Sequence, residues 1–390
     1  MSPTAFGKPM RPLWHLAPDA TFLNHGSFGA CPREVLAEQD RLRLEMEAHP
    51  DRFMRERIMP RAEETGLRAA IAQLARFVGA GASEVALVEN ATSAVQAIVR
   101  SMPLGPGDEV LINDHTYNAV RLIVESRCRE TGARPRVARY PFPATAEGVV
   151  ECLREALTPQ VRLAIVDHIT SPTALAIPLD RVVAELRRFG AKVLVDGAHG
   201  VGHVPLELRA LGADWYVSNA HKWLFAPKGT AFLYAREEVA AMTQPTVVSH
   251  FVESGFPASY DWVGTRDCTG WLALPAALRF FDSLGGEALR YRERLIAHGT
   301  RAMEGLGARA VGADDLACSM RSFILPQQRA AMREDAEALA RQLWQQHRIQ
   351  SMAVAFADKL LLRISAQAYV DAQDLDRLAA ALDRDGWPGR

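Results

Sequence analysis

Lys222 and Asp196 are the two side chains in this sequence whose types and surroundings best fit a chemical role. Each one closely follows a short apolar run, 193–195 for Asp196 and 215–217 for Lys222. A lysine at the end of a buried strand loses hydration when it is charged, so its pKa falls and the neutral, nucleophilic amine becomes available. A buried carboxylate needs a cation or hydrogen-bond donors beside it. The pair therefore predicts a Schiff-base lysine and a carboxylate that holds a cationic group.

A third junction, at residues 89–93 (ENATS), passes directly from a predicted strand into a helix start rich in small residues. Free backbone N–H groups and the positive end of the helix dipole make such a turn a phosphate site. Each junction alone has a plainer explanation, as an ordinary helix cap or a surface lysine. Together they favour pyridoxal 5'-phosphate (PLP), whose ring nitrogen would pair with Asp196 and whose aldehyde would bond to Lys222.

The elements that must position these residues form an α/β pattern. Between about residues 65 and 235, short apolar runs alternate with amphipathic stretches, which predicts a mostly parallel seven-stranded sheet covered by helices. Ligands of such sheets bind at the carboxyl ends of the strands, where the three junctions lie. The predicted strands are 85–88, 110–112, 137–140, 163–166, 193–195, 215–217 and 230–234, and the predicted helices include 68–77, 91–101, 118–130 and 179–189.

Beyond about residue 270 the pattern changes to long helices that flank short strands, which predicts a smaller α+β domain. Since single cores stop growing at roughly 250 to 300 residues, a chain of 390 residues fits two domains. We expect an N-terminal arm (1–25) packing on the small domain, a large PLP-binding domain (26–262) and a small C-terminal domain (263–390). The helices predicted there are 271–284, 287–306, 330–347 and 371–383, and the strands are 321–325 and 360–364.

The composition excludes several other classes of protein. Hydrophobic residues make up 48% and charged residues 23%, as in a globular domain. The 45 basic and 46 acidic residues are scattered, so no nucleic-acid partner is expected. No apolar run suggests a signal peptide or a membrane span, so we expect a cytoplasmic protein. Five cysteines without a Cys-x-x-Cys pair predict neither a disulfide framework nor a metal site.

Two segments, 196–199 (DGAH) and 218–223 (SNAHKW), resemble the signature of the class V aminotransferase family of PLP enzymes, which have fold type I. The resemblance extends from 22–29 (FLNHGSFG) to 363–365 (RIS), and the segment 167–172 (DHITSP) is most similar to the isopenicillin N epimerase-like branch. The family also includes cysteine desulfurases. The resemblance implies a homodimer with shared active sites and an amino-acid-like substrate.

The resemblance also implies a role for each matching residue. Lys222 becomes the catalytic Schiff-base lysine, Asp196 the partner of the ring nitrogen, and His199 a contact of the ring hydroxyl. His115 would stack on the ring, with Tyr117 as a second candidate. The other cofactor-binding positions are Ala91, Thr92, Ser218 and His221 at the phosphate, Thr265 reaching the phosphate from the partner subunit, and Ser171 where desulfurases usually carry an asparagine near the ring hydroxyl. The substrate-binding positions are Asn24 and Arg363, whose guanidinium would pair with the substrate α-carboxylate.

These residues define the cofactor better than the reaction. A desulfurase needs a nucleophilic cysteine shortly before the carboxylate-binding Arg363, and residues 348–362 contain none, which disfavours that activity. Epimerisation needs proton delivery to both faces of a carbanion, by Lys222 and by His115 or Tyr117. The sequence favours an epimerase-like enzyme first, with a C–S lyase or an aminotransferase as alternatives. A PLP-binding protein without turnover is disfavoured, because the catalytic positions are intact.

Overall fold

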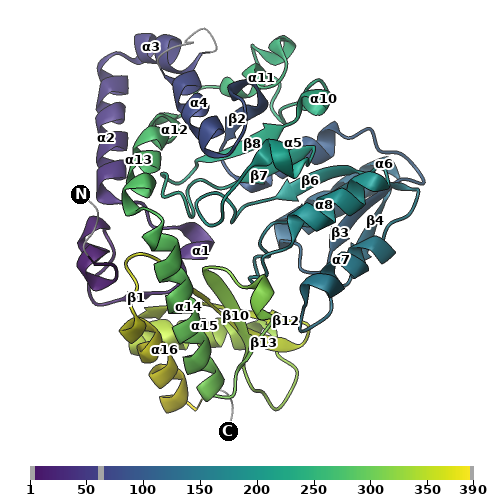
Figure 1. Cartoon of the computed structure of the whole chain (residues 1–390). Helices are drawn as coiled ribbons and strands as arrows, with labels where there is room; N and C mark the ends of the chain where they lie inside the picture. The colour runs from purple at the N-terminus through teal and green to yellow at the C-terminus, as the bar shows by residue number, and fades with distance from the viewer. Residues whose placement is uncertain (1–4, 60–65, 387–390) are drawn as a thin grey trace.

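The computed structural model describes residues 5–59 and 66–386, and a seven-stranded sheet forms the centre of its larger part (Figure 1). The strand order is β2-β8-β7-β6-β5-β3-β4. All neighbouring strands in it are parallel except β8, which is antiparallel to both β2 and β7. The α/β class and the mostly parallel seven-stranded sheet are therefore confirmed. The strands are β2 (Val85–Val88), β3 (Glu109–Asn113), β4 (Arg134–Ala138), β5 (Val161–Asp167), β6 (Lys192–Asp196), β7 (Trp215–Ser218) and β8 (Ala231–Ala235).

Helices cover both faces of this sheet because its central strands carry apolar, buried residues in consecutive positions. Alternate residues of one strand join opposite cores: Val85 packs with one cluster and Ala86 with the other. Helices α5 (Ala91–Ser101) and α6 (Asn118–Thr131) cover one face. Helices α4 (Leu67–Phe77), α7 (Ala146–Glu155) and α8 (Leu179–Arg188) cover the other.

Two predicted elements differ from the structure. The strand predicted at 137–140 is Arg134–Ala138, an edge strand that pairs only with β3 and starts with residues exposed to solvent. Its polar start and Pro135 are tolerated because an edge strand has one free side. The helix predicted at 271–284 is divided into α12 (Thr269–Leu272) and α13 (Leu274–Leu284). Pro275 lies in the first turn of α13, where its missing N–H costs nothing.

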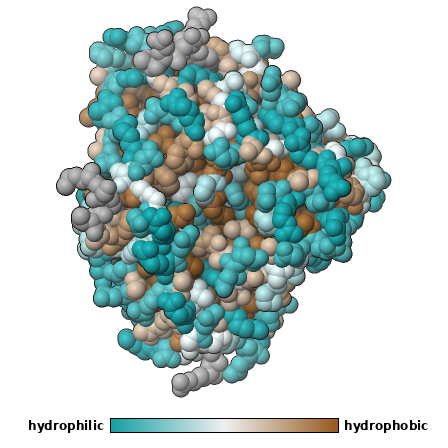
Figure 2. Space-filling view, in the orientation of Figure 1, coloured by the Kyte–Doolittle hydropathy of each residue, from teal (hydrophilic) through white to brown (hydrophobic). Residues whose placement is uncertain are grey.

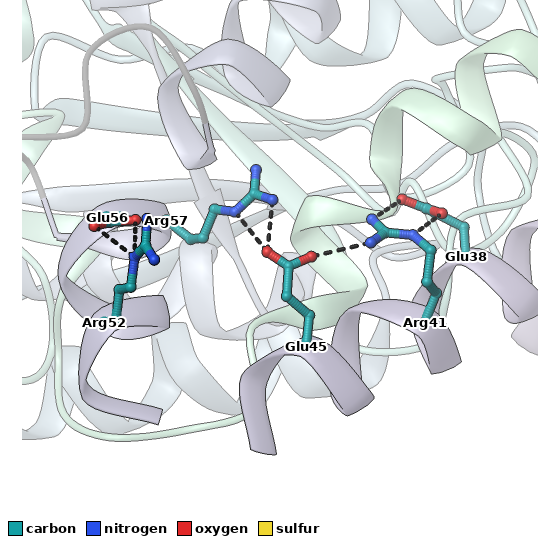
Figure 3. Close-up of polar contacts among 6 residues, drawn as sticks. All are labelled: Glu38, Arg41, Glu45, Arg52, Glu56 and Arg57. Carbon is teal, nitrogen blue, oxygen red and sulfur yellow. Dashed lines mark hydrogen bonds and ion pairs between the residues drawn. The ribbon is translucent and has the colours of Figure 1, made fainter. Parts of the chain in front are cut away.

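Helix α2 (Arg33–Ala48) was not predicted, because it buries only Val35, Gln39 and Leu42 and is otherwise charged. Its outer face carries ion pairs that continue into α3 (Pro50–Phe53) and the following turn η2 (Met54–Ile58), as Figure 3 shows. Glu45 accepts from Arg41 at 3.0 Å and from Arg57 at 2.6 Å. Exposed pairs of this kind contribute about 0.2 to 1 kcal/mol each.

A four-stranded antiparallel sheet in the order β12-β13-β10-β9 forms the C-terminal part. Strand β12 was not predicted, because its hairpin turn is Ala357-Asp358, both at positive φ, and lacks the usual Asn or Gly signal. The strands are β9 (Arg309–Ala310), β10 (Met320–Ile324), β12 (Met352–Phe356) and β13 (Lys359–Ser365). Helices α14 (Glu287–Gly305) and α15 (Arg333–His347) pack on this sheet, and α16 (Ala372–Arg384) packs on α14.

The start of the chain lies against this C-terminal part. Strand β1 (Thr21–Phe22) pairs in parallel with β11 (Ile349–Gln350), and the Gly7 N–H donates to Ala368 O at 2.7 Å. Helices α12 and α13 instead pack on α2 and α4 of the larger part. The proposed boundary at residue 262 thus has contacts across it.

The surface is mainly polar. Hydrophilic residues dominate the outline of the face shown in Figure 2, and hydrophobic ones gather toward its middle. Among the residues that the structure describes, no helix is both long and apolar enough to span a membrane.

The short helix α1 (His25–Phe28) brings the N-terminal segment against the lysine identified from the sequence. The His25 ring contacts Lys222 O at 3.0 Å through Nε2 and Tyr369 Oη at 2.7 Å through Nδ1. The following Gly29, at φ 66°, lies directly on the backbone of residues 221 and 222. A Cβ atom at Gly29 would lie 2.9 Å from Lys222 Cα, so only glycine fits there.

We expect Gly29→Ala to displace the Lys222 segment and to weaken PLP retention at least ~10-fold, because the methyl group meets backbone that cannot move aside. The matched control is Gly255→Ala, which has the same φ of 66° but no atom within 4 Å of the added carbon. PLP retained after dialysis measures the effect. Equal loss in both variants would show that backbone strain alone, not the contact with Lys222, is responsible.

Candidate active site

A cavity of about 170 Å³ lies at the carboxyl ends of the central strands. The loops after β2, β3, β5, β6 and β7 line it, together with α1. Because β8 runs antiparallel between β2 and β7, these two strands end at the same edge of the sheet. The lining residues are Ser27, Phe28, Asn90, Ala91, Thr92, Tyr117, Asp167, Ile169, Ser171, Asp196, Ala198, His199, Asn219, His221 and Lys222.

Lys222 lies in this cavity with its amine 3.3 Å from His199 Nε2. Burial, reinforced by the positive charge of Arg363, lowers the pKa of Lys222 to about 7, and Asp196 opposes this shift. The pKa of His199 lies well below its usual value, so its ring is neutral. Trp223 Nε1 donates to His199 Nδ1 at 3.4 Å, which leaves the ring proton on Nε2. That N–H can donate to the lone pair of a neutral Lys222 amine.

Asp196 and Asp167 lie side by side at the ends of β6 and β5, in register. Asp196 accepts from the Ala198 N–H at 3.0 Å, and Asp167 accepts from Asn113 Nδ2 at 3.1 Å. Burial raises the pKa of both carboxyls, and the negative charge of Asp196 raises that of Asp167 further. Neither carboxylate forms an ion pair within the part of the chain that the structure describes. The carboxyl of Asp196 therefore fits beside a cationic ring nitrogen of PLP.

The start of α5 fits the phosphate of PLP. Asn90 caps the helix by accepting from the Ser93 N–H at 2.9 Å, and Asn219 Oδ1 accepts from the Ala91 N–H at 2.8 Å. Within residues 5–59 and 66–386, the Thr92 N–H has no acceptor. An unfilled donor at a helix N-terminus beside the lysine is the arrangement that a phosphate group requires.

Ser218, which was predicted to contact the phosphate, does not line the cavity. Ser218 is fully buried, and its hydroxyl donates to Gly197 O and accepts from the Val201 N–H. These two hydrogen bonds hold the loop after β6 in place. His221 does line the cavity, and its Nδ1 contacts Thr230 O at 3.0 Å. Thr265 is exposed and does not line the cavity of this subunit. A role of Thr265 across a dimer interface stays a prediction.

The predicted substrate arginine lies just behind the cavity wall. Arg363 is 1% exposed and donates to Ser27 Oγ at 2.8 Å, to Asn24 Oδ1 at 3.1 Å and to the carbonyl oxygen of Ser171 at 2.5 Å. Its Nε has no acceptor among the described residues, and the guanidinium has no carboxylate partner there. A buried cation without a counter-ion fits an incoming carboxylate.

His115 and Tyr117 were the two candidates for the second face of the ring. The His115 side chain is 1% exposed, contacts Thr173 Oγ1 at 2.7 Å and packs on Tyr140 and Phe356, away from the cavity lining. Tyr117 lines the cavity and is 46% exposed. This placement favours Tyr117 as the residue on the open side of the site.

Six lining residues received no role from the sequence: Ser27, Phe28, Asp167, Ile169, Ala198 and Asn219. Asp167 carries the same signal as Asp196, a carboxylate at the end of an apolar strand, and could have been found by it. Asn219 follows β7 directly but acts through the Ala91 N–H, a contact between distant segments that no local pattern shows.

Comparisons with known proteins show one matching family and several relatives. Residues 29–378 match the family described as Aminotransferase class-V. The chain is 33% identical to a putative L-cysteine desulfhydrase 1 of Oryza sativa subsp. japonica over 93% of this chain and 82% of that protein. It is 32% identical to isopenicillin N epimerase of Streptomyces clavuligerus over 94% and 95%. The fold matches the cystine C-S lyase C-DES with a TM-score of 0.79 at 22% identity, covering 94% and 97% of the two chains.

We expect PLP to attach to the cofactor-free enzyme at a rate that rises with pH and levels off above about 7, the pKa of Lys222. Only the neutral amine attacks an aldehyde, and above that pH Lys222 is already neutral. Stopped-flow absorption against pH measures this. Lys222→Ala should abolish attachment and Lys228→Ala should keep it. A rate that still rises near pH ~10, as for an ordinary lysine, would contradict the lowered pKa.

We expect Asp196→Asn to lower turnover at least ~100-fold, because the neutral amide cannot hold the ring nitrogen protonated. Asp167→Asn is the matched control: burial and the negative charge of Asp196 raise the pKa of this neighbouring carboxyl, and the amide keeps its size and its place at the end of β5. This control should keep turnover within about threefold of the parent enzyme. Turnover with an amino-acid substrate at saturating PLP measures both. Equal losses would mean that the two carboxyls share the ring contact.

Proposed function

Since the chain belongs to the class V aminotransferase family of PLP-dependent enzymes, we propose that it is a lyase that breaks the C–S bond of cysteine or a small cysteine-like amino acid by β-elimination. The observation that carries this proposal is the Lys222 amine, with a pKa of about 7. The two lining histidines are too weakly basic to replace it, since burial lowers the pKa of His221 to about 4 and lowers the pKa of His199 well below its usual value. One base near neutrality suffices for elimination.

Bound PLP supplies an electron-withdrawing ring that stabilises negative charge on the substrate α-carbon. Lys222 takes the α-proton, and the neutral His199 beside it lies within hydrogen-bond distance of the amine. Asp196 holds the cation that keeps the ring electron-poor. Ser27 and Ser171 present hydroxyls at the wall in front of Arg363, whose positive charge draws the substrate carboxylate to that side.

The sulfur has no protein thiol to move to. None of the five cysteines lines the cavity, and burial raises the pKa of Cys318 to about 12, which keeps that thiol protonated. The α-proton goes to Lys222, the C–S bond breaks with its electron pair on sulfur, and the sulfur leaves as sulfide. Water then releases the remaining carbon skeleton as pyruvate and ammonia, so cysteine and water give pyruvate, ammonia and hydrogen sulfide.

Epimerisation is the second candidate, and Tyr117 is the observation that favours it. Its phenol lines the open side of the cavity, where a proton donor for the second face would stand. The size of the cavity argues against a peptide-like substrate. A volume of about 170 Å³, below the usual 300 Å³ or more of ligand pockets, favours a small amino acid over a peptide-like one.

We further propose a homodimer in which each subunit supplies Thr265 to the other subunit's phosphate site, and a cytoplasmic location. The exposure of Thr265 and of Phe28, 72% exposed at the cavity rim, supports the dimer because both would be covered by a second copy.

We expect L-cysteine to give equal amounts of pyruvate, ammonia and sulfide, with no persulfide left on the protein. Coupled pyruvate detection, sulfide trapping and intact-protein mass spectrometry measure the three outcomes. In deuterated water, epimerisation would instead exchange the α-hydrogen and yield both stereoisomers without pyruvate. Alanine together with a stoichiometric protein persulfide would contradict both candidates. Tyr117→Phe separates them further, since it should slow epimerisation and spare elimination.

A further inference from the structure

We infer that a second cavity, behind the segment that carries Lys222, binds a monoanionic carboxylate with an apolar body. Its volume is about 420 Å³, and it lies between the loop 202–207 and the junction of α13 with α14. This proposal does not rest on the proposed reaction, because it concerns different residues and a different cavity.

The floor of this cavity carries a buried cation without a counter-ion. Arg292, on α14, is 4% exposed, and among the described residues its only hydrogen bond is from Nη1 to Gly202 O at 3.2 Å. Its Nε has no acceptor, and no carboxylate of the described chain lies within ion-pair distance. A buried charge in this state is costly unless a ligand neutralises it.

A second unused donor lies in the same cavity. Gln367, 1% exposed, uses its Oε1 to accept from the Ala368 N–H at 2.8 Å, while its Nε2 has no partner in the described residues. A guanidinium and an amide N–H that both lack acceptors form the donor set that a carboxylate accepts from.

The walls and rim define the rest of the ligand. The walls are apolar and include Phe77, Leu206, Phe225, Phe281 and Leu284, which suits a branched or aromatic body. The rim carries two exposed carboxylates, Glu207 and Asp282. They repel a second negative charge, so the cavity selects a monoanion over a dianion or a phosphate.

The cavity is connected to the active site through packed rings. The Arg292 guanidinium stands 5.7 Å from the centre of the Trp223 ring, and His203, which lines the cavity, stacks on that ring at 3.7 Å. Trp223 donates to His199, which contacts the Lys222 amine. Only the Trp223 ring therefore separates a ligand charge at Arg292 from His199, which contacts the Lys222 amine.

Isothermal titration calorimetry of the PLP-loaded enzyme with 4-methylpentanoate tests the site, with neutral 4-methylpentanamide as the matched probe. We expect the acid to bind and the amide to bind at least ~10-fold more weakly, the effect of losing a charge-assisted contact. Arg292→Met should abolish the preference for the acid. Arg294→Met, an exposed arginine on the same helix, should keep it.

The same variants separate this site from the active site and from a structural role. Binding of the acid should persist in Arg363→Ala. Loss of binding in Arg363→Ala with retention in Arg292→Met would place the acid in the active site and overturn the proposal.

The melting temperature of ligand-free Arg292→Met should be unchanged or higher, because an uncompensated buried charge is removed. A lower melting temperature without acid binding to the parent enzyme would show that Arg292 is structural. If Arg292→Met does not fold, Gln367→Leu provides the test. It should weaken binding of the acid and leave binding of the amide unchanged. An unchanged affinity for the acid in Gln367→Leu would overturn the proposal. Equal binding of acid and amide, or none, would also overturn it.

Discussion

The active site depends on the removal of charged groups from water without an ion-pair partner in the described part of the chain. Lys222 responds by losing its proton at a lower pH, and Asp196 by a raised carboxyl pKa. Arg363 keeps its charge and uses neutral hydroxyl and carbonyl oxygens as acceptors. Each group is thus held in a state that a cofactor or substrate completes. The apolar strands provide this condition, because they exclude water from both faces of the sheet up to the residue at which each one ends.

Much of this arrangement could be predicted because the strands at the site are apolar on consecutive residues. Asp196 and Lys222 each follow such a strand, so their chemistry and their position were visible in the same few residues. The start of α5 was equally clear, since Asn90 caps the helix only two residues after β2 ends. The sheet, its seven strands and the family follow from these local patterns.

The remaining features depend on contacts between distant segments. Ser218 follows the family pattern, but its hydroxyl is satisfied within the loop after β6, which no spacing shows. His115 is two residues from Tyr117, and the chain turns between them, so one is buried in a cluster of rings and the other opens on the cavity. The charged helix α2 and the hairpin at Ala357-Asp358 were missed because their local signals are weak. Tertiary packing determined all four.

His25 joins the two ends of the chain to its middle, since one ring contacts Tyr369 and the backbone oxygen of Lys222. This arrangement has a consequence for biosynthesis. The lysine segment and its sheet are translated long before Tyr369, so during elongation the central domain lacks one side of the wall behind its lysine. The contact between Tyr369 and the His25 ring can form only after residue 369 has been translated. The wall behind Lys222 is therefore completed late in synthesis, and a chain that ends before Tyr369 lacks this contact.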